Sequence, residues 1–169
     1  LVGTADAYQG VFWVAIRADG STVAAGGELA DGSRGFLVAY DGDTGSPLYE
    51  KTDFPARVNQ VSLSDAGDLL LACYLDTIAL FRRGSTYLFA PAGTHSVAPH
   101  HTIESAMISG DGTRVVAGSI HYENHTTVGS ILSAPVSFPG LGTVTTTDFD
   151  SGVMRVAITA DGSAWGAAL

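Results

Sequence analysis

Positive charge is scarce in this sequence of 169 residues. Eight lysines and arginines stand against 17 aspartates and glutamates, which gives a formal net charge of −9. Because an acidic surface repels phosphate groups, the composition argues against nucleic acid as a partner and against anionic membrane surfaces. Charged residues make up only 15% of the chain and hydrophobic residues 46%, so we expect a sizeable core.

Cysteine is nearly absent as well. The single thiol, that of Cys73, excludes an internal disulfide. It lies in the apolar run from Leu69 to Leu75, which predicts a small buried core residue, and a reactive thiol is the alternative. Since no disulfide indicates a redox compartment, the sequence leaves the localisation of this soluble chain open, an extracytoplasmic one included.

Helical and catalytic patterns are missing too. The longest uncharged stretch, from His125 to Thr147, contains prolines and glycines and is no transmembrane helix, so we expect no membrane insertion. There is no Gly-x-Ser-x-Gly motif and no phosphate-binding glycine loop before a helix. The motifs therefore assign no catalytic residue and no cofactor.

The chain is instead rich in glycine, with 21 residues, and contains an internal repeat. Four segments align without gaps on a glycine, and these glycines are 45 to 50 residues apart. An isoleucine or leucine lies four positions before each glycine and an alanine five positions after it. The aligned segments are residues 14–26, 61–73, 106–118 and 156–168, with the glycines Gly20, Gly67, Gly112 and Gly162.

Each aligned segment predicts a β-hairpin. Two apolar runs flank an Asp-Gly or Ala-Gly pair, and glycine permits the positive φ that tight hairpin turns need. Both runs are almost continuously apolar, so both faces of each strand should be buried. Such hairpins, repeated every 45 to 50 residues, are typical of the inner halves of propeller blades.

Two more strands are predicted after each of the first three hairpins. They cover residues 35–40 and 46–52, residues 77–82 and 86–90, and residues 128–133 and 143–147. The predicted fold class is therefore all-β: a β-propeller of four-stranded antiparallel blades, with about three complete blades and the inner hairpin of a fourth. A barrel or sandwich of irregular hairpins would not explain the regular repeat.

The third strand of the first repeat carries a family resemblance. The stretch from Phe36 to Gly45 begins with an aromatic strand that ends at Tyr40, and Asp41 and a Thr-Gly pair follow it. The pair Tyr40-Asp41 occupies the position at which WD repeats have Trp-Asp. The chain thus resembles a divergent member of the WD-repeat and quinoprotein-like β-propeller superfamily. It departs from the WD pattern, because no repeat has Trp-Asp and no Gly-His pair opens a blade. The resemblance implies a fold rather than a function.

The repeats define the expected domain organisation. We expect one partial propeller over residues 1–169, with an outer strand at 1–8, blades at 11–53, 58–97 and 103–148, and a partial blade at 153–169. Since blades cannot bury both faces alone, this ring would be incomplete. We therefore predict that the chain is part of a longer protein or that another chain completes the ring.

Propeller topology would gather several polar loops on one face of the ring, called here the rim. The expected binding-face residues are Trp13, Arg57, His100, His101, His121, Glu123 and His125. Four of them, His100, His101, His121 and His125, are also candidate metal ligands, because neutral imidazoles bind divalent transition metals. The alternative is a polar, hydrated rim without a metal.

Three functions are compatible with this pattern. The one that the sequence favours is a non-catalytic binding or scaffold module that presents its rim loops to a protein or glycan. The alternative is part of a propeller enzyme, a metal- or quinone-dependent hydrolase, lyase or oxidoreductase that uses the histidines. The third is a role in assembly, because open blade edges invite another chain.

Overall fold

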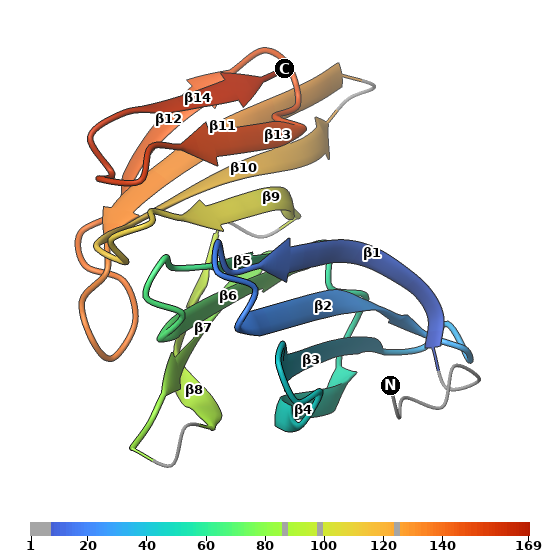
Figure 1. Cartoon of the computed structure of the whole chain (residues 1–169). Coiled ribbons are helices and arrows are strands. Elements are labelled where there is room, and N and C mark those ends of the chain that lie inside the picture. Colours follow the sequence, from blue (N-terminus) through green and yellow to red (C-terminus); the bar gives the residue numbers. More distant parts are fainter. Residues whose placement is uncertain (1–7, 86–87, 98–99, 124–125) are drawn as a thin grey trace.

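The computed structural model describes residues 8–85, 88–97, 100–123 and 126–169 (Figure 1). These residues form 14 strands and no helix, so none of the described segments is a helix able to cross a membrane. The strands are β1 (Tyr8–Ile16), β2 (Thr22–Leu29), β3 (Gly35–Asp41), β4 (Pro47–Phe54), β5 (Gln60–Leu63), β6 (Leu69–Tyr74), β7 (Thr77–Arg83), β8 (Phe89–Ser96), β9 (Thr102–Ile108), β10 (Arg114–Glu123), β11 (Thr126–Pro135), β12 (Thr145–Phe149), β13 (Arg155–Ile158) and β14 (Trp165–Ala168).

Consecutive strands pair into antiparallel sheets. Strands β1–β4, β5–β8 and β9–β12 form three four-stranded sheets, and β13 pairs with β14 alone. The first strands of neighbouring sheets lie together, since β1 contacts β5, β5 contacts β9 and β9 contacts β13 (Figure 1). Three complete sheets and one inner hairpin, arranged along an arc, confirm the predicted fold class.

The four aligned glycines form the same turn in every repeat. Gly20, Gly67, Gly112 and Gly162 have φ values of 76°, 68°, 72° and 67°, a region that other residues adopt at a cost. In each turn the glycine N–H donates to the carbonyl oxygen three residues earlier. The repeat seen in the sequence is thus a repeat of backbone geometry.

Adjacent sheets bury a continuous series of apolar clusters. Leu37 and Phe54 of the first sheet pack with Leu70 of the second, and Leu71 on the opposite face of the second sheet packs with Ile103 of the third. Cys73 lies in this second cluster and is fully buried, as predicted. Burial raises the pKa of its thiol to about 12, so it is a core residue and not a nucleophile.

The outer strands differ most from the sequence prediction. The fourth strand of the second sheet was expected at residues 86–90 but runs from Phe89 to Ser96. It is an edge strand with largely exposed side chains, so apolar residues do not alternate with polar ones along it. A bulge also interrupts its pairing with β7. The sequence therefore carries no clear signal for the residue at which this strand begins. Of the leading strand expected at residues 1–8, only Tyr8 is described, and it opens β1.

Candidate functional site

Three of the candidate histidines meet at one end of the third sheet. His100 and His101 lie just before β9, and His121 lies near the end of β10. The rings of His101 and His121 stack, with centroids 4.8 Å apart and planes inclined by 11°. The His100 ring lies 6.3 Å from that of His121, although the two residues are 21 positions apart.

Hydrogen bonds fix the orientation of both stacked rings. His121 Nδ1 lies 2.9 Å from the carbonyl oxygen of His100, and since a carbonyl only accepts, Nδ1 carries the proton. His101 Nδ1 lies 3.2 Å from Ser119 Oγ. The Ser119 hydroxyl donates to the carbonyl oxygen of Ser130, which leaves its oxygen free to accept from His101.

The surroundings of His101 keep its imidazole neutral at pH 7. Burial lowers the pKa of His101 below its ordinary value of 6.5, because a charged ring loses hydration there. The neighbouring rings of His121 and His100 lower this pKa further, whereas the carboxylate of Asp148 acts in the opposite direction. Within the stack, the ring of His101 is therefore an uncharged aromatic surface near neutral pH.

This pKa makes the stability of the fold depend on pH. In the unfolded chain His101 regains its ordinary pKa of about 6.5, so below that pH the unfolded chain binds more protons than the folded one. The contribution of His101 to stability is complete above about pH 6.5 and declines as the pH falls towards its lower folded pKa. Urea unfolding at about pH 7.5 and about pH 5.5 should show lower stability at the acidic pH.

His101→Gln should reduce this difference between the two pH values, because the amide does not titrate. The matched control is His95→Gln, which removes a histidine outside the stack and should leave the difference in place. An unchanged pH difference in His101→Gln would assign the effect to other groups.

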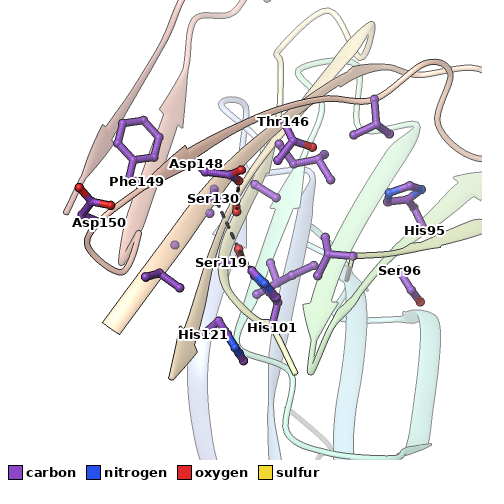
Figure 2. Close-up of a pocket in the computed structure, with 18 residues that line it drawn as sticks. His95, Ser96, His101, Ser119, His121, Ser130, Thr146, Asp148, Phe149 and Asp150 are labelled. Carbon is purple, nitrogen blue, oxygen red and sulfur yellow. Dashed lines mark hydrogen bonds between the residues drawn. The ribbon is translucent and has the colours of Figure 1, made fainter. Parts of the chain in front are cut away.

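A cleft of about 690 Å³ opens beside the histidines, between β8 and the sheet β9–β12. Ser119, Ser130 and Asp148 lie in a row across its floor on β10, β11 and β12, since each pairs with the next in the strand register (Figure 2). The Ser130 hydroxyl donates to Asp148 Oδ1 at 2.7 Å. Apolar side chains complete the cleft on both sides of this polar row, namely Val97, Ile103, Ala117, Val128, Leu132 and Val144.

The other rim candidates lie away from this cleft. Trp13 is on β1, and the guanidinium group of Arg155 on β13 lies 5.3 Å from the centre of its indole ring. Arg57 donates from Nε to Asn59 Oδ1 at 2.8 Å, and its guanidinium group lies 4.9 Å from the Phe12 ring centre. Trp13 is thus on an inner strand and Arg57 in the loop before β5, and neither lines the cleft.

The metal hypothesis rests on fewer residues than the sequence indicated. Within residues 8–85, 88–97, 100–123 and 126–169, no three His, Cys, Asp or Glu side chains are placed to hold a metal ion. His100, His101 and His121 stack or bond to protein atoms instead of converging on a point. His125 and the side chain of Glu123 lie outside the described residues.

Several cleft residues escaped the sequence analysis. Ser119, Ser130 and Thr146 are small hydroxyl residues within strands and belong to no motif. His95 carried no expected role, yet it lines the wall of the cleft opposite His101 (Figure 2). Only the pairing register brings these side chains together, so a single sequence offers no local signal for them.

Comparison with known proteins adds to this picture through structure alone. No known family matches the sequence, and no curated protein does. Solved structures match at TM-scores of 0.67 to 0.70. They include a chain of the mitotic checkpoint complex, with 22% identity over 95% of this chain and 48% of that one. Another is a chain of Kuenenia stuttgartiensis hydrazine synthase, with 18% identity over 99% of this chain and 44% of that one.

A third match decides the architecture. It is the Cps50 (Swd1) β-propeller domain of Myceliophteria thermophila, with 13% identity over 93% of this chain and 48% of that one. The chain folds as part of a β-propeller. Identities this low show the propeller fold alone. The chain spans about half the length of each of these three structures.

Proposed function

We propose that this partial propeller is a non-catalytic binding or scaffold module that receives a protein partner on the rim, in the cleft beside the histidines. The observation that carries the proposal is the cleft of about 690 Å³, whose volume is in the range of ligand-binding clefts. Its walls come from two blades that share a buried cluster, so the cleft exists before a partner arrives.

The chemistry of the cleft suits a peptide segment. Hydroxyl groups of Ser130 and Thr146 and the carboxylate of Asp148 can bond to amide and ammonium groups of a partner. The apolar floor around Leu132 can bury an aliphatic side chain, and the stacked imidazoles offer a flat aromatic face. Because Asp148 and Asp150 add negative charge, segments with basic side chains should bind best.

An enzymatic role for the histidine rim is the alternative, and the closest approach to a catalytic pair is His101 with Ser119. Ser119 is only 4% exposed, and its hydroxyl bonds within the sheet to the carbonyl oxygen of Ser130. A nucleophile must reach a substrate carbon, which this hydroxyl does not. Binding is therefore the function that the geometry favours.

A pair of neighbouring substitutions on β12 tests the binding proposal. The protein is panned against a random peptide library displayed on phage and, in parallel, probed with a glycan array. Thr146→Trp should fill the cleft and weaken the selected peptides at least about tenfold, or about 1.4 kcal/mol. Thr145→Trp places the same side chain on the opposite face of β12 and should leave binding unchanged.

Two outcomes would count against this proposal. One is a set of selected peptides whose affinity is the same for both tryptophan variants, because the cleft would then not be the site. The other is selection of glycans without any peptide, which would assign the cleft to carbohydrate.

A further inference from the structure

The polar row on the floor of the cleft has already used its hydroxyl protons within the protein. Ser119 donates its proton to the carbonyl oxygen of Ser130, so Ser119 Oγ accepts from Nδ1 of His101, 3.2 Å away. The Ser130 hydroxyl donates to Asp148 Oδ1 at 2.7 Å. Since a hydroxyl group has one proton to donate, neither serine has a donor left for a ligand.

The row therefore presents acceptors to the cleft. Because the neutral ring of His101 carries its proton on Nδ1, its Nε2 has a lone pair, and no donor among the described residues is bonded to that atom. Asp148 is exposed, and its carboxylate has more lone pairs than the one that Ser130 occupies. A group that binds across this row must supply N–H or O–H donors, which excludes carboxylates and phosphates.

The spacing of these acceptors favours a guanidinium group. His101 contacts the row at Ser119 on β10, and Asp148 ends it on β12 (Figure 2). The row crosses two strand spacings, about 9–10 Å in all, and the charge of Asp148 still acts on the His101 ring. An ammonium group has all its donors on one nitrogen, whereas a planar guanidinium has donors on opposite edges and suits acceptors on two sides.

Apolar side chains next to the row suit the stem of an arginine. On β11, Val128 and Leu132 lie two positions to either side of Ser130 and therefore share its face of the sheet. Both line the cleft, as does Ala117, which pairs with Leu132. The methylene groups of an arginine can pack on this surface while its charged end reaches the polar row. Asp150 adds a second negative charge that attracts a cation.

We propose that the cleft binds an arginine side chain of a partner protein, with the guanidinium group between His101 Nε2 and the carboxylate of Asp148. The inference rests on the proposed function, because it names the side chain that the cleft recognises in a peptide segment. Lysine suits the row less well, since it has one nitrogen. Citrulline has the shape of arginine without the charge, and its carbonyl oxygen adds an acceptor where the row needs donors.

Nuclear magnetic resonance titration of the nitrogen-15-labelled chain tests the inference, with N-acetyl-arginine amide as the probe. The amide signals of Ser119, Ser130 and Asp148 should shift in a saturable way. The His101 Nε2 signal should move as well, because this atom accepts a new hydrogen bond. The dissociation constant should be at least about fivefold higher for the matching lysine compound and at least about tenfold higher for the citrulline compound.

A pair of substitutions tests the carboxylate in the same titration. Asp148→Asn keeps the size of the side chain and removes its charge, so it should raise the dissociation constant of the arginine probe at least about tenfold. Asp43→Asn is the matched control. It removes the same charge from an exposed position in the turn between β3 and β4, away from the cleft, and should leave the constant unchanged.

Several results would overturn the arginine assignment. They are the absence of saturable shifts in the cleft, equal affinity for the lysine or citrulline compound, an unmoved His101 Nε2 signal, and unchanged affinity in Asp148→Asn. Its failure is distinguishable from failure of the binding proposal. Selected peptides that lack arginine and are still blocked by Thr146→Trp would refute this inference alone, whereas peptides that ignore Thr146→Trp would refute the binding proposal.

Discussion

Truncation of Phe54 to alanine is expected to lower the free energy of unfolding by about 3–5 kcal/mol. Phe54 ends β4 and is 2% exposed, and its ring packs against two aromatic rings of the next blade. Its centroid lies 5.0 Å from that of Tyr74 and 6.4 Å from that of Phe81. The truncation therefore opens a cavity between two blades, where neither sheet can move inward without breaking its own pairing.

The measurement is urea denaturation, and the matched control is Phe138→Ala. Phe138 is 43% exposed, and the guanidinium group of Arg82 lies 4.7 Å from its ring centre. Its loss should cost about 0.5–1 kcal/mol. The free energy of unfolding of a small domain is about 5–15 kcal/mol, so Phe54→Ala should remove a large fraction of it. Equal costs for the two variants would refute the interblade role of Phe54.

Replacement of Gly118 by alanine should lower the free energy of unfolding by about 1–3 kcal/mol. The new methyl group would lie 2.5 Å from Val153 Cγ1 and 3.1 Å from the backbone oxygen of Val153. Because the backbone oxygen of Val153 cannot avoid the new methyl group by a side-chain rotation, the segment before β13 must shift outward. We expect the hairpin β13–β14 to loosen first, with faster amide hydrogen exchange there than in β5–β8.

Gly166→Ala is the control for Gly118→Ala, because an added Cβ at Gly166 meets no atom within 4 Å. Both glycines lie in strands and neither has a positive φ, so the backbone cost of the change is the same. Gly166→Ala should change stability by less than about 0.5 kcal/mol. Similar losses in both variants would show that the contact with Val153 is not what requires glycine.

The inner hairpins could be predicted because their signals are local. A turn glycine at a fixed distance from apolar runs specifies a hairpin through the backbone of a few residues, as at Gly112 and Gly162. The outer strands are less regular, because strands at a sheet edge tolerate exposed and irregular residues. The strand beginning at Phe89 was therefore misplaced.

The candidate site could be predicted only in part. Histidines in rim loops were visible in the sequence, but their stacking depends on the register between β10 and β9 and on the path before β9. The cleft depends on the distance between β8 and the next sheet, which no short segment encodes. Trp13 and Arg57 do not line this cleft, and their place on a binding face stays a prediction.

By itself, then, the sequence determined the all-β class, the number of inner hairpins and the burial of Cys73, because these follow from the spacing of apolar residues and turn glycines along the chain. Tertiary structure alone decided which side chains meet: His101 with His121 and Ser119, and Val153 with Gly118. Such contacts join residues from different strands or blades. They depend on register and on the packing of whole sheets, and these are set by the sum of many weak contacts and not by any local pattern.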